Sequence, residues 1–283
     1  EDGYSEFSEE WENLCERVKL AHYFERVDRL SGIGQYAVLL LGFADGVDLA
    51  QPLGTGRNEL AYVVPYGETN AKITKLVQNT TDARYGLPEV YQLKQGKPYL
   101  GTATVSTQTQ NVHHSRILHV AEFLEENDIY GVPRLLPSLN YLMDLQKVVG
   151  SSAETFWLNA KPGIGLWADK EANLTPEDIV KMKAQAEEWE HQLRRTLVGS
   201  GMTAQQIGAA VADPSSNIGC LLDLISGTHG MPKRILIGSE RGELSSTQDE
   251  SNWSKQIDNR RENFATPTII KPFVELMIAT GNL

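Results

Sequence analysis

A glycine-rich motif near the start of the chain has the residue types that bind dinucleotides. Residues 32–37 read GIGQYA and match the pattern Gly-x-Gly-x-x-Ala. In that fingerprint a strand precedes the glycines, and the helix after them points its N-terminus at a pyrophosphate. Here a helical pattern comes before the glycines and a continuous apolar run comes after them. We therefore expect no dinucleotide site, because no helix N-terminus would face the phosphates.

A histidine pair could take part in acid–base chemistry. Residues 113–115 read HHS and contain one His-x-Ser motif. Cleavage of a phosphodiester by two histidines needs two such motifs facing each other, one histidine as acid and the other as base. Four further histidines lack a hydroxyl residue two positions later: His22, His119, His191 and His229. A histidine pair on a surface strand is therefore the favoured interpretation.

The sequence gives no stronger indication of a metal site or of a pair of catalytic carboxylates than of histidine chemistry. Cys15 and Cys220 lie far apart, and the histidines do not have the paired spacing of a metal site on one helix. Acidic residues within the segment 239–252 could form a Mg²⁺ site, but a flexible loop would leave their geometry unconstrained. The chain also contains no Gly-x-x-x-x-Gly-Lys-Ser/Thr motif for ATP. We therefore predict a protein without catalytic residues, metal or cofactor.

Composition and charge limit the partners. The chain has 283 residues, 41% hydrophobic and 22% charged, which predicts a folded protein with a substantial core. Its 37 acidic residues outnumber its 26 basic ones, for a net charge of −11. Tight DNA binding by phosphate neutralisation is therefore not expected, although an acidic surface is compatible with DNA sliding past it. The longest apolar run, residues 36–41, is far too short to span a membrane.

The first 125 residues are expected to form an α+β unit. Residues 8–30 have the apolar spacing of one amphipathic helix, which the glycines after it would end. The expected strands are residues 36–43, 60–64, 89–93, 99–106 and 112–118. Pro65 places the end of the second strand at a sheet edge or a bulge.

The second half of the chain is expected to be mainly helical. Residues 135–149 have helical spacing, and residues 155–158 resemble a short strand. Thr175 and Pro176 are typical of a helix start, and the predicted helix runs to about residue 197. A compact connector, a helix over residues 215–227, an acidic loop over 239–252 and a long helix interrupted by prolines complete the pattern.

Several segments resemble the portal proteins of tailed bacteriophages. The most specific is residues 231–253, MPKRILIGSERGELSSTQDESNW. The likeness continues in DRLSGIG at 28–34, FWLNA at 156–160, residues 187–197 and RRENF at 260–264. The nearest branch is also described as an anti-CBASS N-terminal domain. The resemblance covers most of the chain and implies an α+β portal fold.

The resemblance also implies a division into domains. Residues 1–170 would form an α/β wing domain, and residues 171–230 two stem helices with a clip inserted at about 199–214. Residues 231–283 would form the tunnel loop and a long returning wing helix. An N-terminal piece and a C-terminal crown found in longer relatives are expected to be missing.

The implied function is structural. Copies of the chain would form a ring-shaped channel, a dodecamer, at one capsid vertex of the virion, after assembly in the host cytoplasm. Double-stranded DNA would pass through it during packaging and ejection without sequence specificity. The expected protein partners are the terminase large subunit, a head-completion or adaptor protein and the major capsid protein, with no membrane partner and no cofactor.

The resemblance assigns two groups of site residues. The residues expected to line the channel are Glu240, Arg241, Glu243, Ser245, Ser246, Gln248, Asp249 and Glu250. The residues expected to dock partners at the clip are Met202, Gln205, Gln206 and Asp213. Repeated around an axis, the acidic channel residues would form rings of negative charge that repel the duplex and let it slide.

Two other functions stay open at this stage. One is a phosphodiesterase-like anti-CBASS protein that degrades cyclic nucleotides, against which the missing second His-x-Ser motif argues. The other is a plain adaptor that acts as a monomer or dimer. A ring with a central hole is expected only of a portal subunit.

Overall fold

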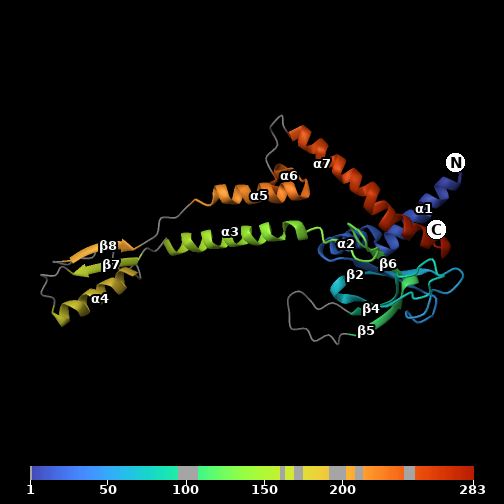
Figure 1. The fold of residues 1–283 in the computed structure, drawn as a ribbon, viewed down its shortest axis with the longest axis horizontal. Helices are drawn as coiled ribbons and strands as arrows, with labels where there is room; N and C mark the ends of the chain where they lie inside the picture. The colour runs from blue at the N-terminus through green and yellow to red at the C-terminus, as the bar shows by residue number, and fades with distance from the viewer. Residues whose placement is uncertain are drawn as a thin grey trace. The chain divides into compact units, whose positions relative to one another are not determined.

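The computed structural model describes residues 2–94, 108–159, 163–168, 175–190, 202–207, 213–238 and 246–283 (Figure 1). It divides into two compact units. The first, which we call the sheet unit, comprises Glu1–Pro137 and Ile237–Leu283. The second, Ser138–Leu236, lies between these two segments in the chain, and we call it the insert unit. Both units contain helices and strands, which confirms the predicted α+β class.

The sheet unit begins with two helices where the sequence predicted one. Helix α1 spans Asp2–Val18 and α2 spans Leu20–Ile33, separated by Lys19 in the left-handed conformation (φ 53°, ψ 47°). Val18 and Leu20 on either side of the break are both buried in the same core. In a continuous helix these two side chains would point about 200° apart. The break lets both reach the core, and it is therefore a result of tertiary packing.

Strand β1 (Ala37–Phe43) is the centre of the first sheet and is buried along its whole length. It pairs antiparallel with β2 (Leu60–Gly67) and with β6 (Ile117–Val120), in the order β2-β1-β6. Alternate residues of β1 enter different clusters, Leu39 with the helices and Val38 with the second sheet. The predicted strand is confirmed. Pro65 lies within β2, which is an edge strand where a missing N–H is tolerated.

The second sheet consists of β3 (Ala71–Leu76), β4 (Pro88–Lys94) and β5 (Thr109–His113), all antiparallel. A 3₁₀ turn, η1 (Glu68–Asn70), leads into it, and η2 (His114–Arg116) leads out of it to β6. The single strand predicted over 112–118 is therefore wrong at residues 114–116, where the chain passes from one sheet to the other. The strand predicted over 99–106 lies outside the described residues.

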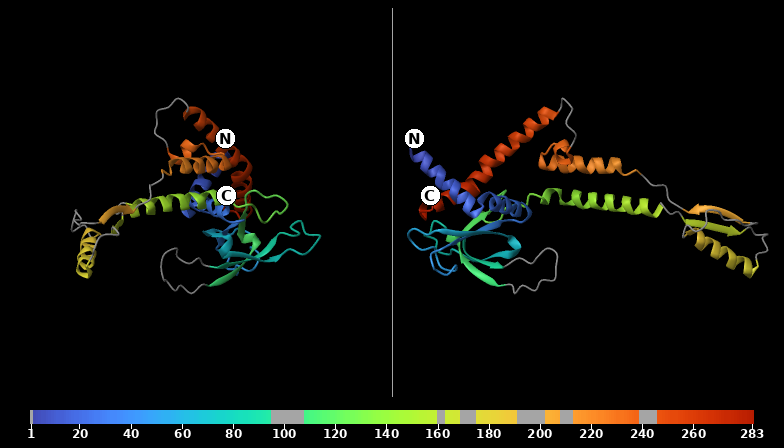
Figure 2. Two further views of the ribbon diagram at one scale, coloured as in Figure 1. Left: turned by 60° about the vertical axis from the view of Figure 1, so that its left-hand side comes forward. Right: turned by 180° about the vertical axis from the view of Figure 1, so that it is seen from behind.

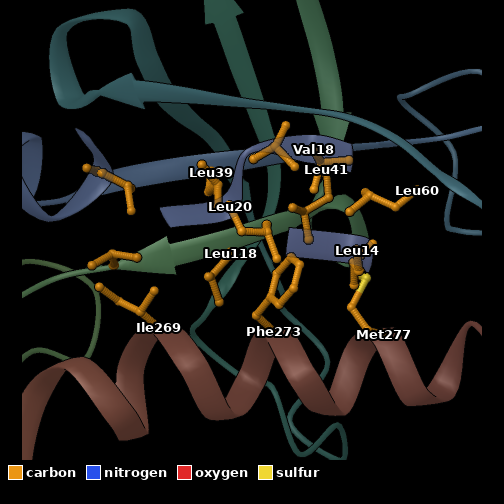
Figure 3. Packing of buried hydrophobic residues seen from close by; sticks show 14 of the residues in the cluster. Leu14, Val18, Leu20, Leu39, Leu41, Leu60, Leu118, Ile269, Phe273 and Met277 are labelled. Atoms are coloured by element: carbon orange, nitrogen blue, oxygen red, sulfur yellow. The ribbon is translucent and has the colours of Figure 1, made fainter. Parts of the chain in front are cut away.

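The chain returns to the sheet unit through α7 (Ser246–Arg260), the π-helical segment η4 (Arg261–Ile270) and α8 (Lys271–Ala279). Pro267 lies inside η4, where its missing N–H interrupts the α-helical ladder, as the sequence predicted. Figure 3 shows Ile269, Phe273 and Met277 on the side of this segment that faces Leu118 and Leu14. The rings of Trp11 and Phe24 meet Phe273 edge to face, with centroids 6.4 and 5.2 Å away. The returning helices therefore complete the main core.

In the insert unit, α3 runs over Leu139–Asn159 after the short turn η3 (Leu136–Ser138). The strand predicted over 155–158 is therefore wrong. Gly150, Ser151 and Ser152 lie inside this helix, and the hydroxyl groups of Ser151 and Thr155 bond to carbonyl oxygens one turn earlier. Ser151 Oγ donates to the Lys147 oxygen and Thr155 Oγ1 to the Ser151 oxygen, both at 2.7 Å.

The remaining elements of the insert unit are β7 (Gly163–Ala168), α4 (Pro176–Glu190), β8 (Met202–Ile207), α5 (Ser215–His229) and α6 (Lys233–Ile237), which ends at the unit boundary. Strands β7 and β8 pair antiparallel, so residues 202–207 are a strand and not the predicted connector. The predicted helix starts at Thr175 and near Ser215 are confirmed. No helix in the described part of the chain is long and apolar enough to cross a membrane.

Candidate functional site

Helices α3 and α5 form an antiparallel pair that the views in Figures 1 and 2 both show side by side. His229 Nε2 at the end of α5 lies 2.7 Å from Ser138 Oγ at the start of α3. At the other end, the Asp213 carboxylate accepts from Ser215 N at 3.0 Å, and the Ser215 contacts lower the pKa of Asp213. Gly230 closes α5 in the left-handed conformation (φ 60°). Hydrogen bonds are therefore present at both ends of the helix pair.

The pair buries little of its own apolar surface. Ile225 is the one buried hydrophobic residue among the described residues of the insert unit. The exposed large hydrophobic residues of α3 and α5 are Leu139, Leu142, Met143, Val149, Phe156, Trp157 and Leu224. Phe156 and Trp157 are 70% and 72% exposed, high values for aromatic side chains on an ordered helix. An apolar surface of this kind marks a contact with another molecule.

A groove of about 610 Å³ lies between the end of α3 and the start of α5. Val149, Ala153 and Phe156 line one side, and Pro214 and Ile218 line the other. Asp213, one of the predicted clip residues, also borders this groove. The groove extends the exposed apolar surface of the pair.

The other predicted clip residues lie on a strand. Met202, Gln205 and Gln206 belong to β8, where Gln205 pairs with Gly165 of β7 and is exposed. The structure therefore brings three of the four clip residues together on one strand, between α4 and α5 in the chain. Asp213 is set apart from them just before α5, where its carboxylate accepts a hydrogen bond from Ser215 N.

The predicted channel residues fall into two groups. Glu240, Arg241, Glu243 and Ser245 lie outside the described residues. Ser246, Gln248, Asp249 and Glu250 form the start of α7, so the predicted loop is wrong from residue 246 onward. An acidic residue in the first turn of a helix is stabilised by the helix dipole, which favours this helical start. Gln248 Nε2 also donates to Asn252 Oδ1 at 3.3 Å, one turn later.

The histidine pair lies at the end of β5. His113 Nδ1 is 2.9 Å from Ser115 Oγ, and the rings of His113 and His114 have centroids 4.3 Å apart. Burial lowers the pKa of both histidines, that of His114 to about 4. The rings lie against each other and do not face each other across a gap. This geometry does not provide the opposed acid and base of a phosphodiesterase.

A four-residue ion cluster, which the sequence analysis missed, holds the end of α7 in the sheet unit. Arg260 Nε donates to Glu122 Oε1 at 2.9 Å, and Arg134 Nε donates to Glu122 Oε2 at 3.0 Å. Both guanidinium groups also contact Asp28 of α2. The Arg260 guanidinium lies 4.7 Å from the centre of the Phe264 ring. The only sequence signal was that Asp28 and Arg260 fall within segments of the portal resemblance.

Solved structures show where this fold occurs. One match is to the virion of a native gene transfer agent particle, with 13% identity and a TM-score of 0.52. It covers 80% of this chain and 59% of that one. Another is to the neck of an empty particle of the same kind, with 14% identity, a TM-score of 0.54 and coverages of 90% and 64%. The chain therefore spans about three fifths of the length of these structures. No curated protein sequence matches it significantly.

A family model described as phage portal protein matches residues 2–280, which is nearly the whole chain. This match confirms the resemblance that residues 231–253 and the shorter segments indicated. The family consists of structural proteins and not of enzymes, so the cyclic-nucleotide hydrolase is not supported. The mixed helix and sheet architecture agrees with the solved particle components. The chain belongs to the phage portal protein family.

Proposed function

We propose that this chain is the subunit of a ring that surrounds double-stranded DNA at one capsid vertex. The observation that carries the proposal is the exposed apolar surface of α3 and α5, which other described parts of the insert unit leave uncovered. The next copy in a ring would cover it. Contacts that join different faces of identical subunits generate closed rings when the rotation closes. The net charge of −11 supports passage of DNA without tight binding.

We assign the stem to α3 and α5. In the chain, β7, α4 and β8 lie between these two paired helices, so this segment fits the clip. This assignment differs from the expectation that α4 is the first stem helix and residues 199–214 the clip. The sheet unit would form the wing, with α7, η4 and α8 as its returning helices. The start of α7 and the residues before it would border the channel.

The partners follow from this assignment. The β7–β8 pair, with Gln205 exposed, would dock the terminase large subunit during packaging and a head-completion or adaptor protein afterwards. The sheet unit would face the major capsid protein. The ring would assemble in the host cytoplasm as a dodecamer and become part of the virion.

Imaging of the purified protein tests the proposal. We expect negative-stain class averages to show a ring with a central hole, and mass photometry to give about twelve times the 31.4 kDa of one chain. The double variant Phe156→Ser/Trp157→Ser should reduce the ring population, because it removes the two most exposed aromatic side chains of α3. Tyr85→Ser is the matched control, since Tyr85 is a 58% exposed aromatic residue of the sheet unit. A wild-type protein that is only monomeric or dimeric would support the adaptor instead.

A further inference from the structure

The sheet unit contains a polar pocket of about 410 Å³ that the portal function leaves unexplained. The loop between β3 and β4 forms one side of it, and the end of β5 with the start of η2 forms the other. Its cationic and imidazole groups come from Lys75, Arg84, His113 and His114. Two carboxylates, those of Asp82 and Glu89, also line it.

Local backbone features give this pocket a defined shape. The β3–β4 register shifts on both sides of Lys75, and irregularities of this kind redirect side chains at sheet edges. In the following loop, Asn79 Oδ1 accepts from Thr81 N at 3.1 Å and Asp82 Oδ1 accepts from Arg84 N at 2.8 Å. These two turns order the loop, and they place Arg84 at the pocket.

The two carboxylates of the pocket balance its two cations in formal charge, but Arg84 forms no ion pair within the described residues. Glu89 Oε1 pairs with Lys75 Nζ at 2.7 Å, and Asp82 is engaged with the backbone of Arg84. The Arg84 guanidinium donates from Nη2 to the Pro88 carbonyl oxygen at 2.9 Å, whereas its Nε is buried without an acceptor. Within the described ranges no carboxylate lies at ion-pair distance from Arg84. A guanidinium in this position lacks the anion that its planar donors favour.

The histidines add neutral donors beside this cation. His113 Nδ1 interacts with Ser115, which fixes the orientation of that ring. The His114 ring lies against it, and its nitrogens make no hydrogen bond to the part of the chain that the structure describes. A neutral imidazole retains one N–H donor, so His114 can donate to an anion without carrying charge.

We propose that this pocket binds an oxyanion of the phosphate class, with the Arg84 guanidinium as the principal ligand and Lys75 and His114 as further donors. The net charge of −11 disfavours non-specific binding of anions to the surface of this chain. Saturable binding therefore requires a local site. The anion could be free phosphate or a phosphodiester of the nucleic-acid backbone, since both present the same oxygens.

Isothermal titration of the full chain with sodium phosphate, at neutral pH and constant ionic strength, tests the site. We expect saturable binding of one phosphate per chain. Arg84→Gln should weaken it by about tenfold or more, the value of a hydrogen bond to a charged group. Lys72→Gln is the matched control, because it removes one positive charge from the exposed side of the same strand, outside the pocket. Absence of saturable binding to the wild type, or equal binding by Arg84→Gln, would overturn the proposal.

A second variant covers the case in which Arg84→Gln does not fold, as judged by circular dichroism. Lys75 is 58% exposed, so Lys75→Gln should fold normally and weaken binding by about threefold. In that case, unchanged phosphate affinity in Lys75→Gln overturns the proposal.

Competition with a short DNA duplex distinguishes the two sources of the anion. Displacement of phosphate by the duplex in the wild type, together with loss of duplex binding in Arg84→Gln, assigns the site to the nucleic-acid backbone. Failure of the duplex to displace phosphate assigns the site to the free ion. Both results support an oxyanion site. The inference does not rest on ring formation, because the pocket lies within the sheet unit of one chain.

Discussion

The sheet unit and the insert unit differ in where their hydrophobic side chains lie. Of the 26 buried hydrophobic residues in the described chain, 25 belong to the sheet unit. The insert unit buries Ile225 and exposes apolar residues along α3 and α5. The sheet unit therefore carries its own core, whereas the described part of the insert unit leaves its apolar surface exposed. One chain thus combines a self-sufficient domain with elements whose packing would be completed by assembly.

The largest expected effect is on the core of the sheet unit. Phe273 is fully buried between Trp11, Phe24 and the first sheet. Phe273→Ala should lower the free energy of unfolding by about 3–5 kcal/mol, because it leaves a cavity in a packed core. Chemical denaturation followed by circular dichroism measures this change. Trp157→Ala, in the insert unit, should change the same free energy by less than about 0.5 kcal/mol. Equal losses in the two variants would contradict the contrast between the units.

The next effect concerns the buried ion pair of the sheet unit. Arg116 is fully buried, and its guanidinium donates to Asp45 Oδ2 at 2.5 Å and from Nε to the Gln51 carbonyl oxygen at 3.2 Å. Asp45→Asn would leave the buried guanidinium without its counter-ion and should cost about 3 kcal/mol in denaturant unfolding. The exposed pair Arg29–Glu25 offers a control, since Glu25→Gln should cost at most about 0.5 kcal/mol.

The same ion pair predicts a pH dependence. The hydrogen bond from Arg116 lowers the pKa of Asp45 below its ordinary value of 3.8. The stabilisation is therefore fully present above the unfolded-state value and is lost as the pH falls through the lower folded-state value. Unfolding curves measured between neutral and acidic pH should converge for the wild type and Asp45→Asn at the acidic end. Parallel curves would show that Asp45 does not titrate with this sign.

The smallest expected effect is local to the insert unit. Thr175 caps α4, since its Oγ1 accepts from Asp178 N at 3.3 Å and donates to Asp178 Oδ2 at 2.6 Å. Thr175→Ala should speed amide hydrogen exchange in the first turn of α4 by about fivefold, the usual result of losing an N-cap. Exchange in β1 of the sheet unit should not change. A global increase in exchange would show that the two units unfold together.

The sequence could predict elements whose signals are local. The apolar run at 36–43 predicts β1, and the cap Thr175 with Pro176 predicts the start of α4. Gly34 ends α2 as expected. Of the predicted site residues, Met202, Gln205 and Gln206 meet on one strand, although the sequence suggested a connector there. The ion cluster of Arg134 and Arg260 could not be predicted, because its members are up to 232 positions apart.

Residues 231–253 and the shorter family segments were sufficient to identify the family, because such motifs are properties of residue order. The local caps and apolar runs likewise needed no coordinates. Folding in three dimensions was needed to break the first helix at Lys19 and to place Arg84 beside His114 in one pocket. The physical reason is that each of these features depends on contacts between residues distant in the chain. The free energy of such contacts depends on residues that lie far outside any local sequence pattern, so a local pattern cannot predict them.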